Sequence, residues 1–243
     1  MPRSAAKTAR RHVGDVKAEH AEAKHGTVKH GTANDGTARP LIPPKPTLPV
    51  LRAAAAGCKA CDLWKTGTQT VFGEGRAPSK IMFVGEQPGD REDRVGSPFV
   101  GPAGLLLDRA LVQAGINRAE TYVTNAVKHF KWEPRGKRRI HKKPRASEIE
   151  ACKPWLEAEI AVVKPQLVVC LGATAAQALL GKTFSVTRQR GELLESKLAG
   201  RVMATVHPSS LLRLTDESDR QQQTERFIQD LRIAAQAVQK LAA

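Results

Sequence analysis

Four short apolar runs, separated by helical patterns, constrain the fold more than any other feature of this sequence. They cover residues 81–85, 121–125, 167–171 and 202–206. Runs this short and this apolar are typical of strands that are buried on both faces of a sheet. Strands that alternate with helices imply a parallel sheet with helices packed on both sides. The sequence therefore predicts a three-layer α/β/α fold around a central, mostly parallel four-stranded sheet.

Helical periodicity fills the stretches between these runs. Ser147 and Glu150 have the spacing of a capping box, in which two side chains satisfy free N–H groups at the start of a helix. Gly115 and Pro165 mark the ends of two patterns. The expected helices cover residues 105–115, 147–164, 173–180 and about 219–241.

Four residues each follow or end one of the predicted strands: Glu86, Asn125, Gly172 and His207. The carboxyl ends of parallel strands meet at one edge of a sheet, and ligands of such sheets bind there. We therefore expect these residues around one crevice, which is the candidate site.

The first 50 residues differ in composition from the rest of the chain. They contain no aromatic residue, and prolines cluster between Pro40 and Pro49. Such a segment cannot bury enough apolar surface to offset the entropy of ordering it. We expect residues 1–50 to be a disordered basic tail with a stiff proline-rich spacer, and residues 51–243 to be the folded domain. Four tail histidines could bind metal, although a solvated tail explains them more simply: His12, His20, His25 and His30.

The formal net charge of +15 is consistent with a polyanion partner or with a generally basic surface. Sequence-independent attraction to DNA is the expected role of the tail. No run of about 18 apolar residues predicts a membrane span, and no apolar segment follows the N-terminal charges. We expect a cytoplasmic monomer.

Two glycine-rich and proline-rich blocks, at residues 85–90 and 96–104, flank one loop after the first predicted strand. They indicate a pocket lined by backbone. Phe99 lies among these turn residues, where it is either part of the core or a platform for a flat ligand.

A rigid polar turn, His207-Pro208-Ser209-Ser210, follows the fourth predicted strand. It suits an imidazole held against a developing anion. The two serine hydroxyls either reach a phosphate or cap the next turn. Arg213 contacts phosphate or the loop that carries His141, or it forms a surface ion pair.

The segment from Lys128 to Arg145 carries nine Lys and Arg residues and one acidic residue, Glu133. It is either a solvated flexible loop or, because it follows Asn125, a contact for DNA. Cations flank His141, so we expect a lowered pKa by like-charge repulsion. An imidazole kept neutral is a nucleophile or a base.

The cysteines indicate a metal site. Cys58 and Cys61 form a C-x-x-C pair, which in a cytoplasmic protein favours metal or redox chemistry over a disulfide. With Cys152 and His129 they make a set of three thiols and one imidazole that suits zinc or an iron–sulfur cluster. Cys170 lies in an apolar run and is expected in the core.

Taken together, these features resemble the uracil-DNA glycosylase superfamily, specifically its iron–sulfur branch, family 4. The resemblance extends from about residue 51 to the C-terminus. Residues 85–89 resemble the first family motif and residues 207–209 the second. The resemblance implies that Phe99 stacks on uracil, that Asn125 hydrogen-bonds the base, and that a [4Fe–4S] cluster is bound.

Three departures from family 4 resemble the UdgX subgroup more closely. His129 stands in place of the third cysteine ligand, residues 138–141 (Arg-Arg-Ile-His) form an insertion, and Gln87 follows Glu86. Members of this subgroup excise uracil and become covalently trapped on the DNA through the histidine of that insertion, which is His141 here.

The resemblance assigns a role to each candidate residue. His207 would donate a hydrogen bond to the uracil oxygen that gains charge, and His141 would attack C1′ of the sugar. Glu86 would orient His141 or accept its proton. Gln87 and Asp90 would line the pocket floor and position any water. The remaining expected substrate contacts are Gly85, Arg138, Arg139, Ser209 and Arg213, and the expected cluster ligands are Cys58, Cys61, His129 and Cys152.

Two other functions remain open at this point. One is a conventional family 4 glycosylase that turns over many times. The other, from a different class, is a non-catalytic nucleic-acid-binding protein with a zinc site.

Overall fold

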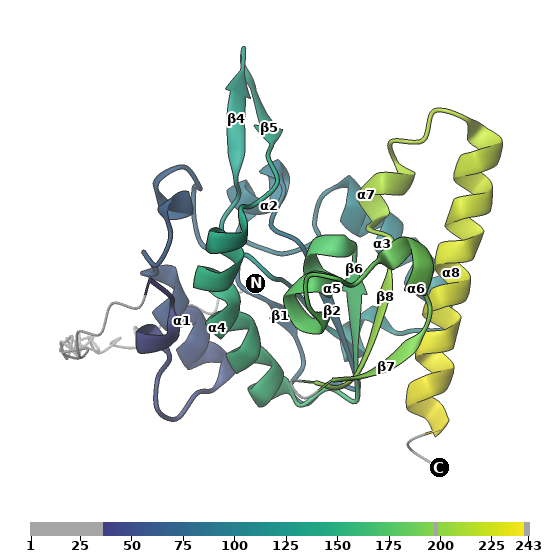
Figure 1. The fold of residues 1–243 in the computed structure, drawn as a ribbon, viewed down its shortest axis with the longest axis horizontal. Helices are drawn as coiled ribbons and strands as arrows, with labels where there is room; N and C mark the ends of the chain where they lie inside the picture. The colour runs from purple at the N-terminus through teal and green to yellow at the C-terminus, as the bar shows by residue number, and fades with distance from the viewer. Residues whose placement is uncertain (1–35, 197–198, 241–243) are drawn as a thin grey trace, which may run out of the picture. The chain divides into compact units, whose positions relative to one another are not determined.

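The computed structural model describes residues 36–196 and 199–240. Its main sheet has six strands in the order β1-β3-β2-β6-β8-β7 (Figure 1). The four inner strands run parallel, and β1 and β7 pair antiparallel at the two edges. The strands are β1 (Glu74–Gly75), β2 (Ile81–Gly85), β3 (Tyr122–Asn125), β6 (Leu167–Leu171), β7 (Leu193–Ser196) and β8 (Gly200–Thr205).

The predicted parallel core of four strands is confirmed, and two short edge strands extend it. Every residue of β2, β3 and β6 is buried, which explains why these strands are continuous apolar runs. The edge strands were missed because neither has such a run. Glu74 and Gly75 form a strand only because β3 offers free backbone groups beside them.

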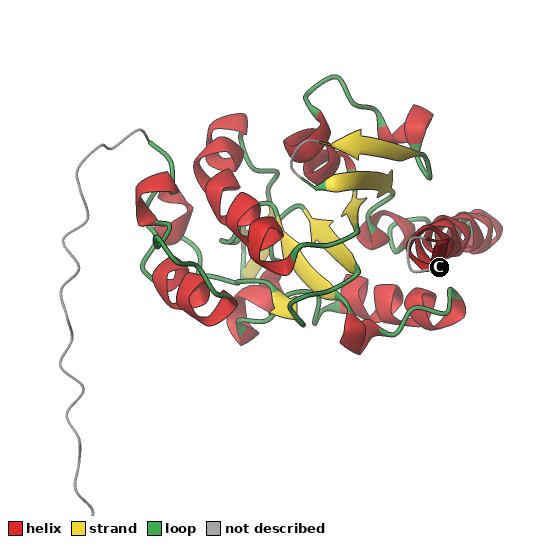
Figure 2. Ribbon diagram, turned by 90° about the horizontal axis from the view of Figure 1, so that it is seen from below, coloured by secondary structure: helices red, strands yellow, loops and turns green. Residues whose placement is uncertain are grey.

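Helices cover both faces of the sheet (Figure 2). Along β2, Ile81 and Phe83 face a core shared with α3 and α8, whereas Met82 and Val84 face one shared with α4 and α5. The α-helices are α1 (Leu48–Ala56), α2 (Asp90–Val95), α3 (Pro102–Gln113), α4 (Ala146–Val163), α5 (Ala173–Leu180), α6 (Val186–Gln189), α7 (Pro208–Leu211) and α8 (Glu217–Lys240). The described residues also form three short 3-10 helices: η1 (Arg39–Leu41), η2 (Asp62–Lys65) and η3 (Arg118–Glu120).

A capping box does begin α4, but the prediction assigned it to the wrong residues. Arg145 is the N-cap, and its backbone N–H donates to Glu148 Oε2 at 2.6 Å. Ser147 and Glu150 have the right spacing, but they lie two residues further along, inside the helix. The helix ends at Val163, before Pro165, as expected.

The folded part begins earlier than the predicted boundary at residue 51. Residues 36–50 include η1 and the start of α1. Ala38 is fully buried, and its N–H donates to the carbonyl of Ala151 on α4 at 2.8 Å. Pro40 and Pro49 lie in the first turns of η1 and α1, where a missing N–H costs nothing. The four tail histidines lie outside the described residues.

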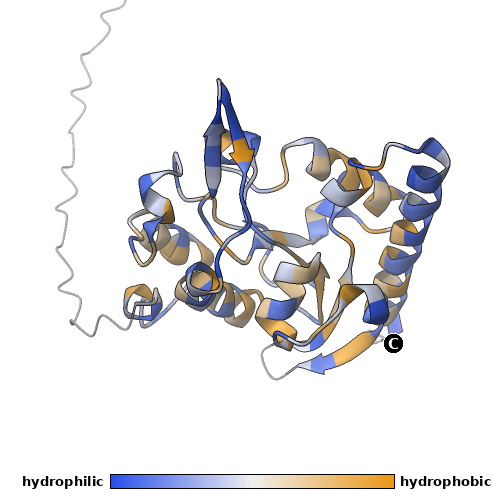
Figure 3. Cartoon of the chain, turned by 45° about the horizontal axis from the view of Figure 1, so that its top comes forward, coloured by the Kyte–Doolittle hydropathy of each residue, from blue (hydrophilic) through white to orange (hydrophobic). Residues whose placement is uncertain are grey.

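The basic segment after β3 is an ordered hairpin, not a flexible loop. Strands β4 (Trp132–Arg135) and β5 (Arg138–His141) pair antiparallel, and Gly136 at φ 58° allows the tight turn. The hairpin projects beyond the carboxyl ends of the sheet strands (Figure 1) and is largely hydrophilic (Figure 3). None of the helices in the described residues is both long enough and apolar enough to cross a membrane.

Candidate active site

The carboxyl ends of the parallel strands form a tightly packed edge. Gly85 of β2 is directly opposite Asn125 of β3. A Cβ built on Gly85 would lie 2.3 Å from Asn125 Oδ1 and 2.7 Å from Phe99 Cζ. On the other side, a Cβ on Gly172 would lie 3.1 Å from the Cβ of His207. The two glycines let the polar side chains and the phenyl ring approach the sheet edge closely.

Phe99 is held in a conformation that few residues other than glycine adopt. Its φ is 57°, and its side chain is buried. Its carbonyl oxygen lies against Gly104, where a Cβ would come within 1.7 Å. The ring lies 5.9 Å from that of His207, with 31° between the planes. Such strain persists only where the surroundings enforce it, and it is concentrated at functional sites.

Glu92 braces the loop that carries Phe99, and sequence reasoning missed it. Its carboxylate accepts hydrogen bonds from Gly89 N–H at 3.1 Å and from Gly101 N–H at 2.7 Å. One buried side chain therefore joins the two glycine-rich blocks. A glutamate three residues after Gly89, which is the spacing of a capping box, was the available signal.

Asn125 carries a hydrogen-bond acceptor with no partner. Within the described residues, its Oδ1 is the only buried side-chain nitrogen or oxygen that makes no hydrogen bond. An unsatisfied buried acceptor costs free energy, so its presence at a strand end needs an explanation. A ligand that donates to this oxygen would supply the partner.

His207 is held as a neutral imidazole with its proton on Nε2. Its Nδ1 accepts a hydrogen bond from the Ser209 N–H at 3.1 Å and therefore carries no proton. Burial lowers its pKa to about 4, with help from the charges of Arg213 and His141. Ser209 Oγ lies 2.8 Å from Nδ1, and Ser210 Oγ donates to the His207 carbonyl. Of the two roles left open for these serines, they cap the turn.

His141 lies at the base of the hairpin, beside Gln87 and Glu86. Gln87 Oε1 accepts from the Lys131 N–H at 3.0 Å, so its amide nitrogen faces His141. That nitrogen donates to His141 Nε2 at 2.8 Å, which leaves Nε2 unprotonated. Glu86 Oε1 is 3.5 Å from the same atom.

The pKa of His141 is lowered, as expected, but for a different reason. Burial is the main cause, the negative charge of Glu86 opposes it, and Arg213 adds to it. The neighbouring cations of the hairpin, which the sequence suggested as the cause, are not among the main ones. The exposed Arg213 is close enough to act electrostatically on both histidines.

Gln87 ties the hairpin to the sheet edge. Its amide nitrogen also lies 3.2 Å from the Lys131 carbonyl oxygen and 3.0 Å from that of Lys142, so its two hydrogens are shared among these oxygens and His141. It thus spans both strands of the hairpin at its base. We expected Gln87 to line the pocket floor and position water, and the structure gives it these contacts instead.

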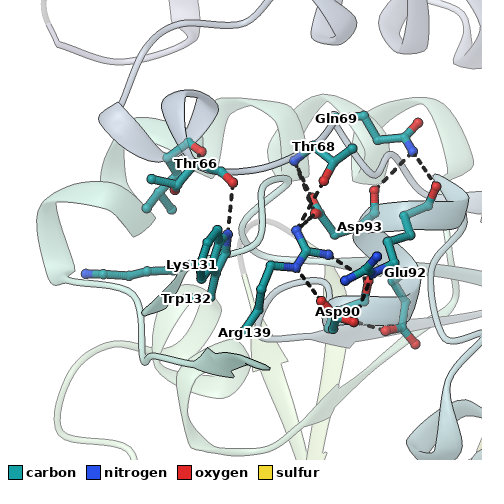
Figure 4. Close-up of polar contacts among 12 residues, drawn as sticks. Thr66, Thr68, Gln69, Asp90, Glu92, Asp93, Lys131, Trp132 and Arg139 are labelled. Atoms are coloured by element: carbon teal, nitrogen blue, oxygen red, sulfur yellow. Dashed lines mark hydrogen bonds and ion pairs between the residues drawn. The ribbon is translucent and has the colours of Figure 1, made fainter. Parts of the chain in front are cut away.

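Arg139 clamps the hairpin to α2 (Figure 4). Its guanidinium pairs with Asp90 and, at 2.6 Å, with the fully buried Asp93. It also lies over the rings of Phe130 and Trp132, 5.4 Å from each centroid. Its nitrogens are thus committed to the protein, although we expected Arg139 to bind substrate. Arg138 is exposed on the same strand.

Asp90 is the other end of this clamp. Burial works against its ionisation, but hydrogen bonds from Arg94 and Arg139 lower its pKa, so it stays charged. We expected Asp90 to position water. In the structure its carboxylate is taken up by the two arginines.

Glu86 has a partner that the sequence did not reveal. The hydroxyl of Thr174, in the first turn of α5, donates to Glu86 Oε2. This leaves Oε1 to face His141. Thr174 lies two residues after Gly172. The turn after β6 therefore supplies both the hydrogen bond to Glu86 and the close approach of His207.

Three free cysteines share one apolar cluster between α1, η2 and α4: Cys58, Cys61 and Cys152. Trp155 Nε1 donates to Cys58 Sγ at 3.3 Å, and Lys128 N–H donates to Cys152 Sγ at 3.2 Å. Burial raises the pKa of Cys152 to about 12, and the neighbouring thiols contribute to the rise. Cys170 is fully buried in the core, as expected.

His129, the expected fourth ligand, makes a different contact. Its Nε2 lies 3.0 Å from the Thr70 hydroxyl, which in turn donates to the carbonyl of Ala55 on α1. Burial lowers the pKa of His129, so its ring is neutral. Among the described residues, no group of three or more His, Cys, Asp or Glu side chains is placed to share a single metal ion.

Comparison with known proteins identifies the fold and its relatives. The family described as the uracil DNA glycosylase superfamily matches residues 72–232. A type-4 uracil-DNA glycosylase of Thermotoga maritima is 41% identical over 64% of this chain and 78% of its own length. A type-4 enzyme of Sulfurisphaera tokodaii is 36% identical over 68% of this chain and 76% of its length. A type-5 uracil-DNA glycosylase of Pyrobaculum aerophilum is 30% identical over 68% and 77%, respectively.

Proposed function

Because this chain belongs to the uracil DNA glycosylase superfamily, we propose that it removes uracil from DNA and then becomes linked to the abasic site through His141. The observation that carries the first half is the unpaired, buried Oδ1 of Asn125 at the sheet edge. The observation that carries the second half is the unprotonated Nε2 of His141, 3.5 Å from Glu86.

Asn125 supplies the base selectivity. Uracil presents an N3–H donor next to the O4 acceptor, which matches the acceptor and donor of one amide. Cytosine presents an N3 acceptor next to an N4 donor, so the same amide would meet two like groups. A base inside a duplex is out of reach, so the nucleotide must be flipped out or the strand must be single. Phe99 would stack on the base, at about 1–3 kcal/mol.

His207 stabilises the leaving group. As the bond from C1′ to N1 breaks, the electron pair passes to the uracil ring, and its O2 gains negative charge. The Nε2–H of His207 donates to that oxygen, because Nδ1 is already used by Ser209. A neutral donor suits this task, since its proton stays on the enzyme while the anion forms.

His141 completes the reaction on the sugar. Once the bond to uracil has broken, the lone pair of His141 Nε2 forms a bond to C1′, and the imidazole becomes a cation with its proton on Nδ1. Solvent takes that proton, and the uracil anion acquires one. Glu86 faces Nε2, which carries no proton, so it makes no hydrogen bond to that atom, and its charge stabilises the positive charge that develops at C1′ and on the ring. An alkylated imidazole is a poor leaving group, so one molecule of enzyme would act once.

One contact favours the conventional alternative. Gln87 donates to the lone pair that must attack, so His141 has to leave Gln87 before it can react. If it does not, water activated beside Glu86 would attack C1′, and the enzyme would turn over. The two outcomes share every step up to bond cleavage and differ only in the nucleophile.

The cysteine cluster is a candidate for the [4Fe–4S] group. Three soft thiols lie together, and N–H groups already point at two of the sulfurs, as is usual around cluster thiolates. A four-iron cluster binds one ligand at each corner, which needs a wider spacing than a single ion does. We propose Cys58, Cys61, Cys152 and His129 as the ligands. When bound, the group would cross-link α1, η2 and α4, and we assign it no chemical step.

Absorbance and metal content test this part of the proposal. A brown protein with about four iron atoms per chain supports the cluster. A colourless protein with one zinc, inactive on DNA, would favour the non-catalytic alternative.

A denaturing gel with a uracil-containing oligonucleotide tests the proposed activity. Wild type should give a slow-migrating band that resists SDS. His141→Ser should lose this band and still release uracil through water. If wild type gives only free abasic product, the conventional alternative holds. If uracil stays attached to the strand, the chain is not a uracil-DNA glycosylase.

A further inference from the structure

A fully buried ion pair lies directly beneath Asn125. The side chains of Lys128 and Glu159 are 1% and 0% exposed, and Lys128 Nζ is 2.5 Å from Glu159 Oε2. The basic composition of residues 128–145 suggested a solvated lysine here. Instead, the chain turns back after β3 and places this ammonium group inside the protein.

The ammonium group has its full set of three acceptors. Besides Glu159, Lys128 Nζ donates to the Asn125 carbonyl at 2.6 Å and to Thr124 Oγ1 at 2.7 Å. Two of its three bonds are therefore to the last two residues of β3. Glu159, on α4, also accepts from the Tyr122 hydroxyl at 2.9 Å, so it contacts the same strand.

Stability alone does not account for such a pair. Removing two charges from water is costly, and apolar residues of similar size often give an equally stable protein. What the pair does achieve is to fix the backbone at Asn125. The side-chain oxygen of that residue has no partner of its own, so only its backbone and its packing against Gly85 keep it directed.

We propose that Lys128 and Glu159 are positioning residues for base recognition, which hold the Asn125 main chain so that its amide meets the pyrimidine edge in one orientation. This inference rests on the proposed function, in which Asn125 reads uracil. The pair does not touch the base. It acts through Asn125, and this distinguishes it from a pair that only stabilises the fold.

The test uses Lys128→Met combined with Glu159→Gln, which removes both charges without leaving either one buried alone. The inhibition constant of free uracil should rise about tenfold, in proportion to one weakened hydrogen bond. Affinity for a uracil-free strand should not change, since phosphate contacts dominate it. Val238→Ala, a core truncation near the far end of α8, serves as the control: it lowers the melting temperature and should leave uracil inhibition at the wild-type value.

A double-mutant cycle decides whether the pair acts through Asn125. In an Asn125→Ala background, the Lys128/Glu159 double substitution should cause no further loss of uracil affinity. Additive losses, or a double variant that matches Val238→Ala, would overturn the inference. A wild-type protein that neither binds nor releases uracil would overturn the proposed function instead.

Thr124→Val keeps the inference testable if the double variant does not fold. It replaces the hydroxyl between Lys128 and Glu159 with a methyl group of similar size. We expect a rise in the uracil inhibition constant of about threefold, again abolished by Asn125→Ala. An unchanged constant in a folded Thr124→Val protein would contradict the positioning role.

Discussion

The sheet edge and the β4–β5 hairpin hold their candidate functional groups by different means. Asn125 and Phe99 are only 2% and 7% exposed, whereas the side chain of His141 is 50% exposed. Asn125 ends a buried strand, and Phe99 lies against Gly85 at the same edge, in a loop braced by Glu92. The hairpin is placed by polar contacts to Gln87 and by ion pairs from its own Arg139 to α2. In the proposed function, recognition of the base therefore rests on residues packed in the core, whereas the covalent step rests on polar contacts that single substitutions can remove.

The largest effect on the reaction should come from a substitution at the sheet edge. His207→Ala removes the donor to the leaving uracil and should lower the single-turnover rate of uracil release by about 10²–10³-fold. Adduct formation should fall by the same factor, because the bond must break before either product forms. Rapid-quench measurement of released uracil checks both. A variant that loses the adduct and keeps fast uracil release would mean that His207 supports His141 on the hairpin rather than the leaving uracil at the sheet edge.

Arg139→Met should separate the two regions. It frees the hairpin from α2 and leaves the buried Asp93 without its guanidinium partner. A displacement of about 1 Å at a reacting atom can cost 10²-fold, so adduct formation should fall by about that factor while uracil release stays within tenfold. The ratio of adduct to free base on a gel measures the effect. Arg138→Met, which changes the exposed neighbour on the same strand, should keep the wild-type ratio.

Thr174→Val tests the hydrogen bond that holds Glu86. Without the hydroxyl, Glu86 is free to turn away from His141, and adduct formation should slow by about tenfold. Thr174→Ser keeps the hydroxyl and should restore the wild-type rate. If the Thr174→Val and Thr174→Ser proteins form the adduct at the same rate, the contact between Thr174 and Glu86 has no role in positioning Glu86.

The smallest effect is that of pH on the nucleophile. The pKa of His141 lies below its ordinary value of 6.5, and only the neutral ring attacks. More than half of the protein therefore remains competent at pH 6.5, and adduct formation should change by less than about twofold between pH 8 and 6.5. Below that range, the rate falls as the ring gains a proton. A tenfold loss by pH 6.5 would show that the ring titrates at a higher pH in the complex with DNA.

The core of the fold could be predicted because the hydrophobic pattern of each element is local. The runs at 81–85 and 167–171 are strands with these bounds, and residues 173–180 form α5 as expected. The cap of α4 was misplaced because two glutamates, Glu148 and Glu150, offer similar spacing. Backbone geometry decides which glutamate caps the helix, and the residue pattern does not predict that geometry.

The charges were harder to predict, because composition does not say where a side chain points. Lys128 and Arg139 belong to the same basic segment. Lys128 is fully buried and bonds to β3, whereas Arg139 forms ion pairs with α2. Both roles need an acidic partner from a distant part of the chain, Glu159 for the first and Asp93 for the second. No local pattern joins such pairs.

By itself, the sequence determined which residues end the parallel strands, and hence that Asn125 and His207 share one edge of the sheet. Apolar periodicity and chain order are enough for that, because parallel strands bring their carboxyl ends together. Which polar groups remain available to a ligand depends on the folded arrangement of the chain. Hydrogen bonds saturate, so a group that finds a partner within the protein, as Arg139 does, is no longer available to the substrate, whereas Asn125 Oδ1 found none among the described residues.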